Sequence, residues 1–372
     1  MTGKFPRARA DSSAQGRIKE IEDEIHRTQY NKATQKHIGM LKARLARLRQ
    51  QEAGQEIGGG KRGLGFGIRK AGDATVLLMG LPSVGKSTLL NALTNAGSPI
   101  GEYDFTTLRV IPGMMLYNGA RIQLLDVPGL ITGAASGRGR GRETLSMARA
   151  ADLICLILDA TKDYAGQLEI IAKELHEAGF RLNQAPPDIR LCRRERGGIS
   201  ITRAAKGKSL PDDTIKEVLR EFGILNAELV LRQGITLDQF VDFLAGNRAY
   251  VPFMAVVNKA DMLKEGRRGP DSLVFISAKT GLNLGALRQI IWGKLGLMRV
   301  YLKRTGHGPD MEEPLVIKGN ARVADVARRI HKDLGRRLFS ARIWGPSARF
   351  PGQSVGPSHR LKDGDVVEMH LK

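Results

Sequence analysis

Cysteine and aromatic residues are scarce in this chain. Only Cys155 and Cys192 are present, and their separation matches neither a disulfide framework nor a metal-ligand spacing. The 7 histidines are scattered along the sequence, so no metal cluster is expected from them. Aromatic residues make up 5% of the chain, which leaves no evident stacking platform for single-stranded nucleic acid. The sequence therefore argues against a disulfide-stapled protein and against a zinc-binding protein.

Long apolar segments are absent as well. No run of about 18 apolar residues is found, which is the length needed to cross a bilayer. The N-terminal stretch MTGKFPRARADSS lacks the short apolar core of a signal peptide. We expect a cytoplasmic protein that neither spans nor binds a membrane.

Acidic residues are outnumbered by basic ones. The chain has 59 Lys and Arg against 38 Asp and Glu, a formal net charge of +21 and a pI near 10.2. Such a chain is attracted to polyanions through counterion release. By charge alone RNA, DNA and anionic membranes are all candidates, and of these we expect RNA rather than a membrane. Solubility alone is the alternative explanation of the charge, and we give it less weight than attraction to a polyanion.

The 372 residues are too many for one average domain, and two to four compact units are expected. Residues 13–53 carry apolar side chains at spacings of three and four, which predicts a helical hairpin within residues 1–57. Its basic outer face either binds nucleic acid or is simply solvated, and solvation is the commoner case. The apolar residues are Ile18, Ile21, Ile25, Ile38, Leu41, Leu45 and Leu48, and the basic ones are Lys32, Lys36, Lys42, Arg44, Arg47 and Arg49.

Short apolar segments alternate with helical patterns from about residue 73 onward. Near-continuous apolar strands of this kind are typical of a parallel sheet covered on both faces, so the pattern predicts a doubly wound α/β fold. We assign this domain to residues 58–177 and 246–300, with residues 58–70 as a glycine-rich basic linker. The five strand segments are 74–80, 120–129, 152–160, 251–261 and 273–279.

An insertion interrupts this domain. Roughly 90 residues separate Ala160 from Val251, far more than a simple crossover needs. Strands are predicted at 188–195 and 198–204 and a helix at 212–223, which gives a small α+β subdomain over residues 178–245. The C-terminal residues 301–372 read as strand 314–318, helix 322–335, strand 340–345 and strand 363–371, a pattern that predicts a β-grasp domain.

GLPSVGKST, residues 80–88, follows the first predicted strand and opens a helix. In this context the spacing G-x-x-x-x-G-K-[ST] predicts a phosphate-binding loop. The glycines permit a tight loop whose N–H groups face the phosphates, Lys86 neutralises the β- and γ-phosphates, and Ser87 binds Mg²⁺. The expected nucleotide contacts are Gly80, Pro82, Ser83, Val84, Gly85, Lys86, Ser87 and Thr88.

Three further motifs follow in the order expected for a GTPase. Asp126 and Gly129 in DVPG hold the magnesium ion and sense the γ-phosphate. In NKAD, Asp261 accepts from the N1–H and exocyclic amine of guanine, while Asn258 and Lys259 shape the base pocket. In SAK, the backbone around Ser277 and Ala278 donates to guanine O6, and Lys279 covers the base. The ordered set predicts a guanine nucleotide, GTP or GDP, as the ligand.

A switch threonine is expected between the phosphate loop and Asp126. DFTTL offers Thr106 and Thr107 there, and a hydroxyl with a backbone carbonyl at this place completes Mg²⁺ coordination. We prefer Thr107, since an ordinary β-branched strand residue is a fair explanation of Thr106. The predicted metal ligands are therefore Ser87, Thr107 and Asp126. Lys86, Thr107 and Gly129 are the residues expected to act on the γ-phosphate during hydrolysis.

Five segments together, GLPSVGKSTLLNALT, YDFTTL, IQLLDVPGLI, GRGRGRE and NKAD, resemble the developmentally regulated GTP-binding proteins of the Obg-like superfamily. The resemblance covers residues from about 10 to 372. It implies an N-terminal helical domain, a P-loop NTPase domain interrupted by an S5D2-like subdomain, and a C-terminal TGS domain. It also implies slow GTP hydrolysis, association with the ribosome or RNA, and a dedicated protein partner that stabilises or stimulates the GTPase.

Leu130 follows Gly129, where many GTPases carry a glutamine that orients the attacking water. An apolar side chain cannot align water, so intrinsic turnover should be slow. Related GTPases with an apolar residue here often use K⁺, held in part by a phosphate-loop asparagine, but this chain has Ser83 at that position, which argues against a K⁺ requirement. Arg138, Arg140 and Arg142 either supply a catalytic guanidinium or contact a partner or RNA, and we favour the contact role because a glycine-flanked cationic loop is not preorganised.

We therefore expect a monomeric GTPase switch whose GTP-bound form engages a ribosome or structured RNA. A second hypothesis is an RNA-binding scaffold in which the nucleotide is structural. A third, a P-loop kinase or ATPase, is opposed by NKAD.

Overall fold

The computed structural model describes residues 14–29, 31, 34–56, 71–94, 103–105, 108–127, 148–204, 210–263 and 273–371. The chain forms two compact units. The first, which we call the insertion unit, combines the N-terminal helices with residues 184–250. The second, the sheet unit, contains residues 65–183 and 251–372. The chain thus leaves the sheet unit after Asn183 and returns to it at Val251, where the Asn183 N–H donates to the Val251 carbonyl at 3.1 Å.

A seven-stranded sheet in the order β12-β11-β5-β1-β4-β3-β2 forms the centre of the sheet unit. Its first five strands are parallel to one another, and β3 and β2 are added as antiparallel strands. The bounds are β1 (Ala74–Met79), β2 (Tyr103–Phe105), β3 (Leu108–Tyr117), β4 (Ala120–Asp126), β5 (Leu153–Asp159), β11 (Phe253–Asn258) and β12 (Val274–Phe275).

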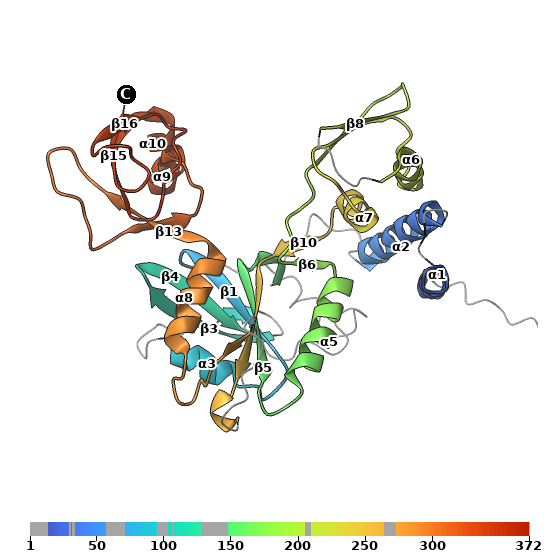
Figure 1. Ribbon diagram of the computed structural model, residues 1–372, viewed down its shortest axis with the longest axis horizontal. Coiled ribbons are helices and arrows are strands. Elements are labelled where there is room, and N and C mark those ends of the chain that lie inside the picture. The colour runs from blue at the N-terminus through green and yellow to red at the C-terminus, as the bar shows by residue number, and fades with distance from the viewer. Residues whose placement is uncertain are drawn as a thin grey trace, which may run out of the picture. The chain divides into compact units, whose positions relative to one another are not determined.

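The five parallel strands coincide with the five apolar segments of the sequence. β1 and β5 are buried along their whole length, as strands covered on both faces should be. Helices α3 (Lys86–Leu93) and α8 (Leu284–Leu295) lie on one side of the sheet and α5 (Tyr164–Glu177) on the other (Figure 1). The predicted doubly wound α/β fold is confirmed.

The antiparallel strands β2 and β3 are missing from the prediction. β3 turns back into β4 at Asn118 and Gly119, whose φ angles are 50° and 77°. Two consecutive positive φ angles are typical of a type I′ hairpin turn, for which Asn-Gly is the preferred dipeptide. The dipeptide between two apolar segments was therefore a usable sequence signal for this hairpin.

The C-terminal part of the sheet unit forms a five-stranded sheet in the order β14-β13-β17-β15-β16. Val323, Val326 and Ala327 of helix α9 pack on the apolar face of this sheet. The predicted β-grasp pattern is confirmed, with β13 and β16 in addition to the predicted strands. The bounds are β13 (Leu297–Leu302), β14 (Leu315–Lys318), α9 (Val323–Ile330), α10 (Lys332–Arg337), β15 (Leu338–Trp344), β16 (Gln353–Val355) and β17 (Asp365–Leu371).

The single helix predicted over residues 322–335 is two helices in the structure. His331 separates α9 from α10 and has an extended backbone, with φ −156° and ψ 141°. Its Nδ1 accepts the Asp333 N–H at 3.2 Å, which caps α10. Apolar spacing alone cannot reveal this break, because the histidine is compatible with either conformation.

Only Gly296 separates α8 from β13. Its carbonyl accepts the Gly319 N–H at 2.6 Å. Leu297 of β13 and Val316 of β14 belong to the same buried cluster as the apolar residues of the parallel sheet. The β-grasp domain therefore begins inside the core of the nucleotide-binding domain, four residues before the predicted start at residue 301.

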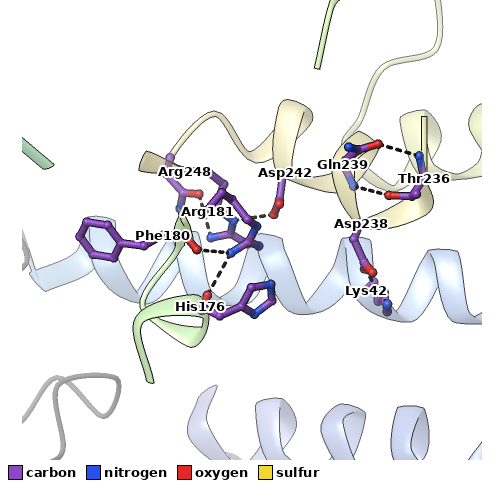
Figure 2. A network of polar contacts seen from close by, with 10 residues as sticks. Lys42, His176, Phe180, Arg181, Thr236, Asp238, Gln239, Asp242 and Arg248 are labelled. Atoms are coloured by element: carbon purple, nitrogen blue, oxygen red, sulfur yellow. Dashed lines mark hydrogen bonds and ion pairs between the residues drawn. The ribbon is translucent and has the colours of Figure 1, made fainter. Parts of the chain in front are cut away.

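The insertion unit contains a three-stranded sheet in the order β7-β9-β8. The predicted strands and helix of this region correspond to β7, β8 and α6, whereas β9 and α7 were not predicted. Helix α7 begins with a capping box, in which Thr236 Oγ1 accepts the Gln239 N–H and Gln239 Oε1 accepts the Thr236 N–H (Figure 2). The bounds are β7 (Ile189–Arg193), β8 (Ile199–Arg203), α6 (Asp212–Glu221), β9 (Ala227–Leu231) and α7 (Leu237–Ala245).

Two short strands connect the units, β6 (Phe180–Leu182) before the insertion and β10 (Ala249–Val251) after it. In the sheet unit a 3₁₀ turn covers Ala260–Met262.

The predicted N-terminal hairpin corresponds to α1 (Ala14–Arg27) and α2 (Gln35–Glu56). Helix α2 does not stand alone: Ile38, Ala43 and Ala46 are buried in one cluster with apolar residues of α6 and α7. The N-terminal helices and the insertion therefore share a hydrophobic core. Of the helices that the structure describes, none is long and apolar enough to cross a bilayer.

The basic face of α2 is largely paired with acidic residues of the same unit. Figure 2 shows one of these pairs, between Lys42 of α2 and Asp238 of α7. Lys32 lies outside the described residues. Each of the other five cations of this face has a partner within the unit, so these side chains are not merely solvated. The four ion pairs compensate part of the charge that would attract nucleic acid. The contacts are Lys36 to Glu217 at 3.1 Å, Lys42 to Asp238 at 2.6 Å, Arg44 to Glu221 at 3.9 Å, Arg47 to the Glu221 carbonyl at 2.5 Å and Arg49 to Glu22 at 2.5 Å.

Candidate nucleotide-binding site

The predicted phosphate loop connects β1 to α3. Gly80 and Gly85 have φ angles of 154° and 92°, which residues with side chains rarely adopt. A Cβ at Gly80 would lie 2.4 Å from the Ile157 carbonyl oxygen, and one at Gly85 would lie 2.4 Å from Asn258 Nδ2. Both positions therefore require glycine. The tight loop leads directly into the first turn of α3, whose N–H groups and positive end favour an anion such as phosphate.

Lys86 is the first residue of α3 and is 9% exposed. Its Nζ donates to the carbonyl oxygens of Gly80 and Leu81, each at 3.1 Å. Burial lowers the pKa of Lys86 from its ordinary value, and the Asp126 charge offsets part of this effect. A partly desolvated ammonium gains more from an anionic ligand than an exposed one does. Lys86 is thus suited to bind phosphate at this loop.

Ser87 and Asp126 come together as predicted. Ser87 Oγ donates to Asp126 Oδ2 at 2.6 Å. Asp126 is 4% exposed, and its Oδ1 is buried with no hydrogen-bond partner among the described residues. A buried carboxylate oxygen normally needs a donor or a cation, and hard oxygen ligands of this kind suit Mg²⁺. These two side chains therefore fit a magnesium ion.

The described residues supply only part of a magnesium shell, and the predicted ligand Thr107 lies outside them. Within the described part of the chain, no group of three or more His, Cys, Asp or Glu residues is arranged to hold a metal. Mg²⁺ is commonly held by one or two protein carboxylates together with phosphate oxygens and water.

Asn258 connects three of the motifs. It lies at the end of β11 and is 3% exposed. Its Nδ2 donates to the Val84 carbonyl of the phosphate loop at 2.9 Å, and its Oδ1 accepts the Ala278 N–H of SAK at 2.9 Å. One amide side chain therefore fixes the phosphate loop, NKAD and SAK relative to one another.

The residues predicted to read the base lie on both sides of Asn258. Asp261 is exposed in the 3₁₀ turn that follows β11, and Lys279 is exposed at the end of SAK. Ser277 is fully buried, and its Oγ accepts the Thr280 N–H at 3.1 Å. The Ala260 N–H donates to the Ile276 carbonyl at 2.9 Å, which joins the NKAD turn to the strand before SAK. An accessible carboxylate beside a fixed backbone loop can accept from the guanine N1–H and amine.

Asp159 was not among the predicted site residues. It ends β5, is 1% exposed, and its Oδ2 accepts from Lys259 Nζ of NKAD at 2.7 Å. The sequence does contain a signal: the apolar run DLICLILDA ends in a carboxylate, as the strand before Asp126 does. Polar residues at the carboxyl ends of neighbouring parallel strands meet at one edge of the sheet, where ligands bind.

Seven residues that the sequence analysis considered for the switch threonine, for γ-phosphate sensing, for hydrolysis or for partner contact lie outside the described residues. They are Thr106, Thr107, Gly129, Leu130, Arg138, Arg140 and Arg142. Their roles stay predictions, as does the slow hydrolysis, and the use of K⁺ stays an open question.

Comparison with known families agrees with this geometry. Residues 75–190 match the family model described as a 50S ribosome-binding GTPase, and residues 196–297 match the model for the C-terminal region of that domain. Residues 298–370 match the TGS domain. Fold, site and matches together define a P-loop GTPase with a C-terminal TGS domain.

Relatives that align over nearly the whole chain identify the family within this class of GTPases. An uncharacterized GTP-binding protein of Methanocaldococcus jannaschii is 48% identical over 95% of this chain and 92% of its own. Developmentally-regulated GTP-binding protein 2 of Bos taurus is 41% identical over 96% of this chain and 99% of its own. Its homolog in Dictyostelium discoideum is 43% identical over the same shares, 96% and 99%. The chain belongs to the family of developmentally regulated GTP-binding proteins.

Proposed function

We propose that this GTPase is a slow, Mg²⁺-dependent switch that acts on the ribosome or on structured RNA. The contact between Ser87 and Asp126 carries the proposal. Asp126, a predicted metal ligand, is also the first residue of the segment DVPGLITGAASGRGRGRE, residues 126–143. A ligand bound at Asp126 can therefore bias the conformation of this segment.

The chemistry of hydrolysis requires charge neutralisation and a positioned water. Lys86 and the N–H groups of the phosphate loop supply positive charge along the phosphates, and Asn258 holds that loop in place. Mg²⁺, when bound, neutralises the charge that develops on the β- and γ-phosphates. Leu130 cannot hydrogen-bond to the attacking water, which is the reason to propose slow intrinsic turnover.

The proposed partner rests on charge and on the family. The net charge of +21 favours a polyanion, and the matching family model is described as ribosome-binding. Because the cations of α2 are largely compensated within the insertion unit, we place the RNA contact on other basic residues, with Arg138, Arg140 and Arg142 as candidates. A protein that stabilises or stimulates the GTPase, a monomeric state and a cytoplasmic location complete the proposal.

Ribosome co-sedimentation tests the switch directly. The protein is mixed with ribosomes of its source organism without nucleotide, with GDP, or with a non-hydrolysable GTP analogue, at several salt concentrations. We expect stronger binding with the analogue than with GDP, because a switch requires differential affinity, and binding that weakens as salt rises.

The same measurement separates the switch from its rival. Equal binding with GDP and the analogue would contradict the switch and favour a scaffold whose nucleotide is structural. No binding in any nucleotide state at low salt would contradict both.

A further inference from the structure

Both carboxylate oxygens of Asp159 accept hydrogen bonds at the edge of the sheet where the nucleotide-binding motifs lie. Oδ2 accepts from Lys259 Nζ at 2.7 Å. Oδ1 accepts from the Thr161 N–H at 2.9 Å and from Thr161 Oγ1 at 2.7 Å. The carboxylate is 1% exposed, so these donors, rather than water, determine its orientation.

The backbone around this pair is fixed as well. Asp159 lies beside Asn258 in the parallel register of β5 and β11, and the Ala160 N–H donates to the Asn258 carbonyl at 2.9 Å. Lys259 follows Asn258 with a positive φ of 65°, an uncommon conformation for a residue with a long side chain. The Lys259 side chain is therefore fixed at both ends, by its backbone conformation and by the hydrogen bond from its ammonium group to Asp159.

The carboxylate stays ionised in this environment. Burial alone would raise the pKa of Asp159, but the hydrogen bonds from Lys259 and Thr161 outweigh burial and hold the pKa below its ordinary value. A buried carboxylate paired with an ammonium gives a short, charge-assisted contact that restricts the lysine strongly.

We infer that Asp159, oriented by Thr161, is a positioning residue that holds Lys259 of NKAD in place and so sets how long a guanine nucleotide stays bound. The alkyl stem of a lysine held at its ammonium end forms a rigid wall of the base pocket. Without its acceptor the lysine samples many rotamers, and ordering it on binding costs free energy. This inference rests on the guanine-nucleotide site described above, and it does not depend on the ribosome as partner.

Asp159→Asn tests the inference, because the amide removes the negative charge and keeps an oxygen that Thr161 can donate to. The rate of dissociation of fluorescently labelled GDP is measured by chase with unlabelled GDP in the presence of Mg²⁺. We expect dissociation about 10- to 100-fold faster than in the wild type, the range for losing a hydrogen bond to a charged group.

A double-mutant cycle shows whether Asp159 acts through Lys259. We expect Lys259→Met to accelerate dissociation by itself and Asp159→Asn to add nothing further in that background. Additive effects of the two changes would overturn the inference, as would a change of less than about twofold in Asp159→Asn alone.

Two controls separate positioning from folding and from base reading. Asp163→Asn removes a nearby carboxylate that accepts the Gly166 N–H at 3.1 Å at the start of α5, and it should leave dissociation unchanged. Asp159→Asn should also retain the wild-type preference for GDP over xanthosine diphosphate. Loss of that preference would show that Asp159 takes part in base reading. A thermal midpoint without nucleotide that falls together with the affinity in both Asp159→Asn and Asp163→Asn would show a general structural role. Either result would overturn the inference. If the wild type itself retains no labelled GDP, the GTPase site fails, and the inference fails with it for a separate, visible reason.

Discussion

Lys318 Nζ lies 2.9 Å from Asp152 Oδ1, which pairs a lysine of the TGS domain with the carboxylate that precedes β5. Asp152 Oδ2 accepts the Thr75 N–H of β1 at 3.0 Å. One carboxylate at the amino end of the parallel sheet thus joins two neighbouring strands and the TGS domain. Asp73 is arranged similarly, since its oxygens accept from the Arg121 N–H at 2.9 Å and from Arg329 at 3.2 Å.

We expect Asp152→Ala to lower the free energy of unfolding by about 1–3 kcal/mol, because it leaves a buried N–H of β1 without its acceptor. Lys318→Ala should cost less than about 1 kcal/mol, since the lysine is mostly exposed. Urea unfolding without nucleotide measures both. Equal losses of unfolding free energy in Asp152→Ala and Lys318→Ala would show that Asp152 stabilises the fold only through its ion pair with Lys318.

Removal of the predicted phosphate contacts should abolish tight nucleotide binding. We expect Lys86→Ala to weaken GTP–Mg²⁺ binding at least about 100-fold, since it removes a charge-assisted contact to phosphate. Ser87→Ala should remove most of the Mg²⁺ dependence of the affinity. Titration calorimetry with and without Mg²⁺ measures both effects, and Ser200→Ala on β8 of the insertion unit is the control. Retained wild-type affinity in Lys86→Ala would contradict the predicted phosphate site.

Asp261→Asn should weaken the preference for guanine, because the amide no longer accepts from both donors of the base. The expected result is a shift in selectivity from GTP toward xanthosine triphosphate, by about 10-fold or more for a pair of hydrogen bonds. Competition against labelled GDP measures the ratio. An unchanged ratio would show that Asp261 does not contact the base.

Changing the three arginines of residues 126–143 distinguishes their two possible roles, contact with RNA and catalysis. If Arg138, Arg140 and Arg142 contact RNA, changing all three to alanine should reduce ribosome binding and the slope of its salt dependence, while basal GTP hydrolysis is unchanged. Co-sedimentation and single-turnover phosphate release measure the two quantities. Slower hydrolysis with intact ribosome binding would assign them to catalysis instead.

The TGS domain should lose stability in acid through Glu368. Lys303 lies 3.0 Å from this buried glutamate and, against the effect of burial, holds its pKa below the ordinary value. A carboxylate with a depressed folded-state pKa stabilises the fold above its unfolded pKa, near ~4.3, and this stability disappears as pH falls through the folded value. We expect Lys303→Met to raise the pKa of Glu368 and to move acid unfolding to higher pH.

Tryptophan fluorescence provides the measurement for this prediction. Lys303 Nζ lies 4.1 Å from the centre of the Trp344 ring, and a Trp292→Phe background leaves Trp344 as the only tryptophan of the chain. Lys362→Met, which removes another lysine of the same domain, is the control. Identical acid midpoints for the Lys303 and Lys362 variants would show that the ion pair does not contribute.

Sequence reasoning located the parallel sheet and its motifs because both are local signals. Each motif lies at or after the end of an apolar strand. Ser87 and Asp126 meet because β1, which leads into the phosphate loop before Ser87, is the neighbour of β4. The hairpin at Asn118 and Gly119 was missed although its dipeptide is also a local signal.

Other features depend on contacts between distant parts of the chain. Lys42 and Asp238 are 196 residues apart, and no pattern in α2 shows that its cations have partners. Asp159 gains its role only from Lys259, 100 residues later. Apolar spacing predicted α2 as half of a hairpin, and it could not reveal that Ala43 and Ala46 pack on α6 and α7.

The junction at Gly296 has a mechanical consequence. A linker of several flexible residues would let the TGS domain reorient independently of α8. Here a single residue joins α8 to β13, so the orientation of the strand depends closely on that of the helix. Helix α8 starts just after Lys279, at the loop predicted to hold the guanine ring. Because Leu297 and Val316 are buried in the same cluster as the parallel sheet, a reorientation of α8 would be felt first by β13 and β14.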